Sequence, residues 1–371
     1  MESHTAPLFF IGAMPPPVHG ASNVNARMFE ALGQGQVNVH LFDIARGRVN
    51  KPGETRSPGD QEGELRKFAR FFRSMASAPG RKTTYLSISG GLGQVRDLLY
   101  IAISRIFCAK IYVHHHSFAY LNKRKLVTRL CVLAAGPRSD HIVLCDRMAM
   151  LLSQQYRIRR ERISCLSNAA FLPISGNTAA RQTLKTVSFL SNITFEKGIA
   201  TFVELANELH ARGVPVQCRI AGPAAPEVQG WLDDALAKAP YIEYLGAQYG
   251  ADKKRFLEQT DLLVFPSAYA NEAEPVTILE AFSFGIPTIA TALGCIPGLV
   301  AEERGFVLDT QACTAAAIAD LIAQLTKDQP AYQCLSANCS AYIEKSSAVH
   351  SAALNEIVGA IQRGGDFGAP P

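Results

Sequence analysis

The sequence predicts an α/β protein made of two doubly wound, Rossmann-like domains that face a central cleft. Short apolar segments alternate with amphipathic segments, and this alternation stops after residue 171 and restarts near residue 186. Strands that alternate with helices form a parallel sheet covered by helices on both faces. The length of 371 residues suits two domains of ordinary size, and 48% hydrophobic residues suffice for a core in each.

The first half begins with an apolar strand at 8–12 and a helix from about Ser22. Val24, Met28, Phe29 and Leu32 recur in that helix at helical spacing. The same criteria predict strands at 37–42, 84–87, 109–114 and 141–144, and helices at 62–75, 95–107, 121–135 and 148–155. Residues 45–62 are rich in glycine, proline and charge, which indicates a mobile loop.

The second half follows residues 171–177, whose proline, glycine and asparagine indicate a linker. Strands are predicted at 186–190, 217–221, 242–244, 262–265, 288–290 and 306–307. We therefore assign residues 1–172 to a first domain and residues 173–348 to a second. Ligands of such sheets bind at the carboxyl ends of the strands, so the site of each domain is expected there.

The segment 262–282 carries the strongest functional signal. An apolar strand at 262–265 leads into a loop, and Pro275 suits the first turn of the helix that follows. Glu272 then falls in the loop, and Glu280 falls in the second helical turn, eight positions later. The two acids therefore contact different groups of a ligand, and the free amides of the helix start favour an anion beside them. Acid pairs at helix starts also occur simply because they suit the helix dipole.

This segment closely resembles the acid-x7-acid signature of the retaining glycosyltransferases of family 4, which have the two-domain GT-B fold. Segments 285–291 and 294–297 also match the pattern of that family. The resemblance implies that Glu272 contacts the transferred sugar and that Glu280 holds the ribose hydroxyls of the nucleotide. It also implies that the first domain binds the acceptor, that the second binds the donor, and that a last helix at about 349–363 packs back on the first domain.

Residues 191–198 follow a strand and open a helix, where a lysine can reach a diphosphate. The segment resembles the Gly-Arg-x-x-x-x-Lys-Gly element of the family. Lys197 matches its lysine and Gly198 its glycine, whereas Asn192 stands at the arginine position and removes one charged bidentate donor. The resemblance implies further donor contacts by Asn192, by glycines at loop and strand ends and by residues at the start of the helix that carries Glu280. Besides Asn192, these residues are Gly20, Gly222, Gly246, Glu274, Pro275 and Val276.

Three adjacent histidines end a strand of the first domain. Strand alternation places His114 and His116 on one side and His115 on the other. The resemblance implies a histidine that faces the transferred sugar, and His116 fits best, with His114 as the alternative. Three adjacent imidazoles do not easily bind one metal, and the nine cysteines show no CxxC spacing, so we expect neither a metal nor a cofactor.

Charge is divided unevenly between the two halves. Residues 1–180 contain 24 Lys and Arg against 11 Asp and Glu, a net of +13, whereas the remainder has a net of −8. Two basic clusters predict attraction to anionic lipid head groups or phosphates, although a solvated basic face without a partner is the alternative. They are Lys123, Arg124, Lys125 and Arg129, and Arg157, Arg159, Arg160 and Arg162. No pattern typical of nucleic-acid binding is present. With no apolar run near the ~20 residues of a membrane span and no signal peptide, we expect a cytoplasmic protein, peripheral at the inner membrane face.

The sequence therefore predicts a metal-independent, retaining hexosyltransferase that uses a nucleotide-diphosphate sugar. Its acceptor is a glycan or lipid-linked glycan of cell-surface polysaccharide or lipopolysaccharide assembly. Two alternatives remain: a sugar-nucleotide epimerase or hydrolase of the same architecture, and an inert glycan-binding protein.

Overall fold

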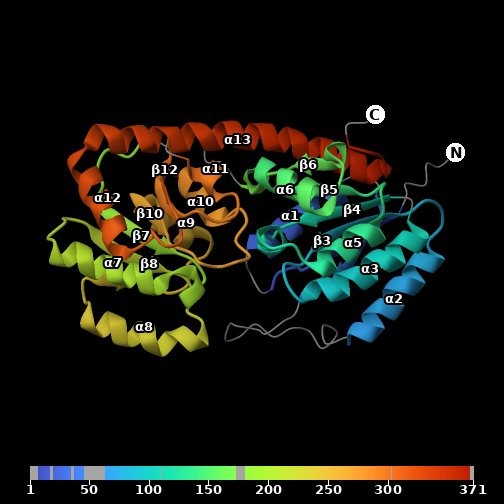
Figure 1. Ribbon diagram of the computed structural model, residues 1–371, viewed down its shortest axis with the longest axis horizontal. Coiled ribbons are helices and arrows are strands. Elements are labelled where there is room, and N and C mark those ends of the chain that lie inside the picture. Colours follow the sequence, from blue (N-terminus) through green and yellow to red (C-terminus); the bar gives the residue numbers. More distant parts are fainter. Residues whose placement is uncertain are drawn as a thin grey trace. The chain divides into compact units, whose positions relative to one another are not determined.

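The computed structural model describes residues 7–16, 20–34, 37–45, 63–108, 110–172, 180–301 and 303–367 (Figure 1). The chain forms two compact units: residues 1–171 together with 349–371, and residues 172–348. The predicted loop at 45–62, apart from Ala45, and the linker beyond Leu172 lie outside the described residues.

The first unit contains a parallel six-stranded sheet in the order β2-β1-β3-β4-β5-β6. Its strands are β1 (Leu8–Gly12), β2 (Val39–Asp43), β3 (Thr83–Ile88), β4 (Lys110–His115), β5 (Asp140–Val143) and β6 (Ile163–Cys165). Its helices include α1 (Gly20–Gly33), α2 (Glu64–Ser77), α3 (Gly93–Phe107), α4 (Ala119–Asn122), α5 (Leu126–Ala135) and α6 (Asp146–Tyr156). The sequence analysis missed β6, because three residues are too few for a periodic pattern.

The single helix predicted at 121–135 is wrong, because α4 ends at Asn122 and α5 begins at Leu126. Lys123 and Lys125 are extended, with φ and ψ of −141° and 120° and of −114° and 137°. The backbone N–H of Lys125 donates to Tyr156 Oη at 3.0 Å, which holds the chain in this conformation. Three consecutive cations also repel one another, so an exposed basic turn replaces the helix there.

The core of the first unit is formed by apolar strands and by the end of the chain. Phe10 of β1 stacks on Tyr85 of β3, with ring centroids 4.7 Å apart. Ile357 and Ile361 of helix α13 (Gln329–Arg363) pack in the same core. This helix starts twenty residues before the predicted position 349, in a serine- and alanine-rich stretch with weak hydrophobic periodicity.

The segment after α13 is held to the amino ends of β4, β5 and β6 by an ionic cluster around the buried Asp140. Asp140 accepts from Lys110 Nζ at 2.9 Å and from Arg162 Nη1 at 3.1 Å. Both cations also bind Asp366, and the N–H of Phe367 donates to Asp140 at 3.1 Å. The last described residues are therefore an integral part of the first unit.

The second unit also contains a parallel six-stranded sheet, in the order β12-β11-β10-β7-β8-β9. Its strands are β7 (Thr186–Leu190), β8 (Gln217–Ala221), β9 (Ile242–Tyr244), β10 (Leu262–Phe265), β11 (Thr288–Thr291) and β12 (Gly305–Leu308). Its helices are η4 (Phe195–Lys197), α7 (Ile199–Ala211), α8 (Pro226–Lys238), α9 (Gly250–Glu258), α10 (Val276–Phe282), α11 (Ile296–Val300), α12 (Ala315–Lys327) and the first part of α13. Two parallel α/β units were predicted, and this fold class is confirmed.

Both sheets reverse their strand order at one point. In the second unit, β7 lies between β8 and β10, so the chain leaves β7 in one direction and later continues from β10 in the other. In the first unit, the reversal lies between β1 and β3. The crevice outside the carboxyl ends at such a reversal is where open α/β sheets bind ligands.

No helix among the described residues is long and apolar enough to cross a membrane.

Candidate active site

The loop between β10 and α10 holds the predicted acid pair at the reversal point of the second sheet. Glu272 lies in this loop and is buried, whereas Glu280 is half-buried in the second turn of α10. Pro275 is the residue that caps α10, with φ of −65°, and Val276 is its first residue. The local positions expected from the proline and the apolar strand are therefore observed.

Glu272 is paired with Lys197, from the turn after β7. Lys197 Nζ lies 2.5 Å from Glu272 Oε2, and Ser267 Oγ donates to the same oxygen at 3.3 Å. The ammonium group also lies 4.5 Å from the ring centroid of Tyr269. An ammonium has three donors, so Lys197 can hold Glu272 and still donate to a second anion.

The two loops that carry this pair are packed against each other through a glycine. Gly198 has φ of +87°, and a Cβ at this position would lie 2.2 Å from the carbonyl oxygen of Pro266. The N–H of Ala268 also donates to the carbonyl of Glu196 at 2.8 Å. Any larger residue at position 198 would separate the loops and move Lys197 away from Glu272.

Glu280 has a lysine partner of its own. Lys253 Nζ, from α9, lies 2.7 Å from Glu280 Oε1 and 2.5 Å from Oε2. Sequence analysis missed Lys253, because Asp252, Lys254 and Arg255 beside it are typical of an exposed helix face. Each acid of the signature therefore forms an ion pair with one lysine, and the two lysines come from η4 and α9.

A backbone cluster at the ends of β7, β8 and β9 contains the predicted glycines. Gly222 has φ of +136°, and a Cβ there would lie 1.7 Å from the carbonyl oxygen of Ser191. The Gly222 N–H donates to the carbonyl of Gly246 at 2.7 Å. Asn192 is exposed in the same turn. These residues leave backbone groups rather than long side chains at this part of the edge.

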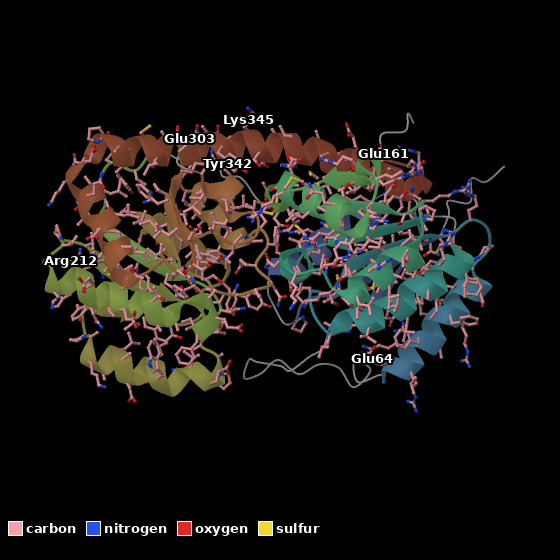
Figure 2. The ribbon with its side chains drawn as sticks, in the orientation of Figure 1. Glu64, Glu161, Arg212, Glu303, Tyr342 and Lys345 are labelled. Carbon is pink, nitrogen blue, oxygen red and sulfur yellow. The ribbon has the colours of Figure 1, made fainter. Side chains whose placement is uncertain are left out.

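Glu274 faces the interior of the second unit. It is buried, and its charge acts together with burial to raise the pKa of Tyr342, which is labelled on α13 in Figure 2. Behind the acid loop, the N–H of Cys295 donates to the carbonyl of Ala273 at 2.8 Å. The predicted 294–297 segment thus supports the loop, and donor contact by Glu274 stays a prediction.

The remaining predicted residues, Gly20 and His116, belong to the first unit. Gly20 is the exposed first residue of α1, two residues before the predicted helix start, and residues 17–19 lie outside the described part of the chain. His116 follows the end of β4 and is half-buried. Its ring lies 3.9 Å from that of His114, so the predicted alternation of the histidines is observed.

His114 and His115 are both fully buried and bonded to neighbours. His114 Nδ1 lies 2.5 Å from Tyr85 Oη. On the other side, His115 contacts Tyr120 Oη at 2.8 Å and His141 Nδ1 at 3.0 Å. Of the three adjacent histidines, His116 is the most accessible to a ligand.

Burial keeps these inner histidines neutral. It lowers the pKa of His114 and His115 well below the usual range and lowers the pKa of His141 to about 3. Neighbouring histidines, and Lys110 in the case of His141, act in the same direction. Among the described residues, no three His, Cys, Asp or Glu side chains are grouped so that they could hold a metal ion.

Residues 173–345 match the family model of the group 1 glycosyl transferases. This range contains both acids, both lysines and the loops that position them. The second unit is a group 1 glycosyltransferase domain. The predicted resemblance to family 4 glycosyltransferases is confirmed.

Solved structures share the fold around this glycosyltransferase domain. HepE from Anabaena, crystallised with UDP, has a TM-score of 0.68 at 15% identity, covering 95% of this chain and all of HepE. Sucrose-phosphate synthase from Thermosynechococcus elongatus has a TM-score of 0.68 at 16% identity, covering 96% of this chain and 98% of the synthase. At these identities the likeness establishes the fold.

Curated relatives of the glycosyltransferase domain are named for polysaccharide assembly. WcaL of Salmonella typhimurium, named for colanic acid biosynthesis, is 29% identical over 135 residues, 34% of this chain and 33% of WcaL. AmsK of Erwinia amylovora, named for amylovoran biosynthesis, is 26% identical over 129 residues, 33% of this chain and 31% of AmsK. The matches thus span about a third of each relative.

Proposed function

We propose that this protein is a retaining glycosyltransferase that transfers a hexose from a nucleotide-diphosphate sugar to a glycan, without a metal ion. The observation that carries the proposal is the Lys197–Glu272 pair at the reversal point of the second sheet. In the proposal, Lys197 of this pair binds the diphosphate and Glu272 binds the sugar, and the pair lies next to the start of α10.

In the proposed reaction, Lys197 and the amides at the helix start stabilise charge that develops on the leaving nucleoside diphosphate. Glu272 binds hydroxyls of the sugar, and Glu280 binds the ribose. The bond between the sugar C1 and the phosphate oxygen breaks. The acceptor oxygen forms the new bond to C1 from the same face, and its proton passes to the leaving phosphate oxygen. Because Lys197 already holds Glu272, we assign this acid to sugar binding rather than to a covalent intermediate.

His116 is proposed to contact the transferred sugar from the first unit. Its neighbour His114 is enclosed and bonded to Tyr85, which leaves His116 as the accessible imidazole of this strand end. Asn192, Gly20, Gly222, Gly246, Glu274, Pro275 and Val276 are proposed to complete the donor site.

The nucleotide is proposed to be a uridine diphosphate. HepE, which shares the fold, was crystallised with UDP and with UDP-glucose. In the second unit, the backbone cluster of Gly222 and Gly246 offers N–H and C=O groups to a base.

The acceptor is proposed to be a growing or lipid-linked glycan of cell-surface polysaccharide assembly, as the names of WcaL and AmsK suggest. We place the protein in the cytoplasm, attached peripherally to the anionic inner membrane face through its basic first half. The net charge of +13 in residues 1–180 supports this attachment.

Thermal unfolding with a panel of nucleotide sugars tests the donor, because a ligand that binds only the folded protein raises Tm. We expect the largest shift with a UDP-sugar and a similar shift with UDP. Turnover is then followed with and without a glycan acceptor. Release of UDP or a changed sugar without acceptor would indicate the hydrolase or epimerase, and no ligand-dependent shift at all would indicate an inert binding protein.

A further inference from the structure

Helix α3 buries Arg96, Asp97 and other polar residues beside Tyr100 and Ile101, and it exposes apolar residues on its outer side. Arg96 and Asp97 are buried, and Arg96 Nη1 donates to the carbonyl of Ile44 at 2.8 Å. Asp97 Oδ2 accepts from the N–H of Ser89 at 2.7 Å, and Thr128 of α5 donates to Gln94 Oε1 at 2.7 Å. These buried bonds fix the rotation of α3 about its axis, so the helix cannot turn to bury its outer face.

The outer face of α3 is an apolar stripe. Val95, Leu99 and Ile106 are spaced at i, i+4 and i+11, and they are 54%, 49% and 73% exposed. Leu92, just before the helix, is 89% exposed. Residues at this spacing lie along one side of a helix, so the stripe runs the length of α3.

Helix α5, which lies beside α3, carries a second stripe of the same kind (Figure 1). Leu126, Leu130 and Leu133 are exposed at i, i+4 and i+7, while Thr128 and Cys131 face inward. Helix α2, on the other side of α3, adds the exposed Leu65 and Phe72. We refer to the exposed apolar residues of α2, α3 and α5 as the apolar face.

The surroundings of the apolar face are basic. Residues 63–139 contain 14 Lys and Arg but only two acids, of which Asp97 is buried and Glu64 lies in the first turn of α2 (Figure 2). Exposed cations occur on all three helices and in the turn before α5. They include Arg66, Arg73, Arg105, Lys123, Lys125 and Arg129.

We propose that the apolar face inserts into the interfacial region of an anionic lipid bilayer, with the surrounding cations on the lipid phosphates. Helices that combine leucines with Lys and Arg lie in this way at the boundary between headgroups and acyl chains. Two copies of the chain would bring strongly positive surfaces together, which disfavours self-association. This inference rests on the proposed membrane attachment and specifies the side chains that enter the lipid.

One end of the apolar face lies at the edge of the first sheet where we propose that the acceptor binds. Helix α3 begins shortly after the carboxyl end of β3. Strand β4 pairs in parallel with β3, and His116 directly follows the carboxyl end of β4. Leu92 and Val95 therefore lie at the same edge of the first sheet as the proposed acceptor-side histidine. An acceptor anchored in the bilayer would present its glycan at that edge.

The test measures co-sedimentation with vesicles of phosphatidylglycerol and phosphatidylcholine, at low salt and at about 1 M salt, where the Debye length falls to about 3 Å. We expect Leu99→Gln with Leu133→Gln to lower the partition coefficient about tenfold at either salt concentration. Lys123→Glu, Lys125→Glu and Arg129→Glu together should lower it mainly at low salt. Val349→Gln is the matched control: Val349 is 56% exposed on α13, so its loss should leave partitioning unchanged.

Each result has a distinct meaning. Equal partitioning of the double leucine variant and the wild type would overturn insertion but leave electrostatic attachment standing. A wild type that never sediments with the vesicles would overturn insertion and the proposed membrane attachment together. A dimer in solution that the leucine substitutions dissociate would make the apolar face a self-association surface and overturn the inference. UDP binding, measured separately, reports on the proposed transferase activity and does not depend on these outcomes.

Discussion

The two units hold their candidate residues with different interactions: ion pairs in the second unit, and contacts between neutral side chains in the first. In the second unit, Glu272 and Glu280 are charged and each is held by a lysine. In the first unit, the ring of His116 lies beside the buried, neutral His114, which in turn contacts Tyr85. Ion pairs can exchange one partner for a ligand, whereas a neutral buried network can only keep its geometry. Under the proposed roles, the donor-binding residues must be able to change partners, whereas the residues behind His116 must only hold it in place.

Acidification should have the largest effect of the changes considered, and it should destabilise the first unit more than the second. His114, His115 and His141 have lowered pKa values in the folded chain, so below about pH 6.5 the unfolded chain binds protons that the folded chain cannot. Stability is therefore retained above pH 6.5 and lost as the pH falls towards 3. All three histidines should therefore destabilise the folded chain as the pH falls.

The single tryptophan makes this measurable, because Trp231 lies on α8 of the second unit. Circular dichroism reports both units, and tryptophan fluorescence reports the second. We expect the dichroism to change at a higher pH than the fluorescence. Coincident transitions would show that the histidines do not set the acid sensitivity of the first unit.

Lys197→Ala should have the next largest effect, since it removes the proposed cation for the diphosphate. The expected loss is about 1.5–3 kcal/mol of affinity for UDP, the range of a charged hydrogen bond. Calorimetry measures this, and Lys197→Arg serves as a control that keeps the charge. Unchanged affinity in the alanine variant would reduce Lys197 to a structural partner of Glu272.

Glu280→Ala should weaken UDP binding by about tenfold, because the ribose loses a charged acceptor. Glu280→Gln keeps part of the hydrogen-bonding capacity and should fall between the alanine variant and the wild type. Lys253→Gln leaves Glu280 in place and should change affinity less than either. Equal binding by all four proteins would exclude Glu280 from the ribose.

His116→Ala should lower kcat by about tenfold, the value of about 1.4 kcal/mol of transition-state stabilisation, and leave UDP affinity intact. His114→Ala provides the contrast, because it removes a buried partner of Tyr85 and should chiefly lower Tm. If His114→Ala lowers kcat at unchanged Tm while His116→Ala has no effect, the sugar contact belongs to His114.

The sequence predicts the local structure around Gly198 and the 262–282 segment well because its signals are local. Pro275 and the strand at 262–265 predict where the loop ends and the helix begins, and Gly198 identifies the turn that presents Lys197. Lys253 could not be predicted in this way. Its partner Glu280 lies 27 residues further along the chain, and neither residue carries a pattern that points to the other.

Helix α3, which buries several polar residues and exposes several apolar ones, shows a second limit of sequence-based prediction. Apolar residues occur all around 95–107, so hydrophobic periodicity predicts the helix without predicting which side is buried. The buried side is decided by Arg96 and Asp97, whose bonds go to Ile44 and Ser89 in distant or preceding segments. The interruption at Lys123–Lys125 likewise depends on Tyr156, 31 residues from Lys125.

The ionic cluster around Asp140 has a consequence for biosynthesis. Lys110 and Arg162 are translated long before Asp366, and Ile357 and Ile361 of the first core also emerge late from the ribosome. The second unit, residues 172–348, can complete its sheet before the last part of α13 and Asp366, which belong to the first unit, have been synthesised. Although the first unit begins to emerge before the second, its folding is completed after that of the second.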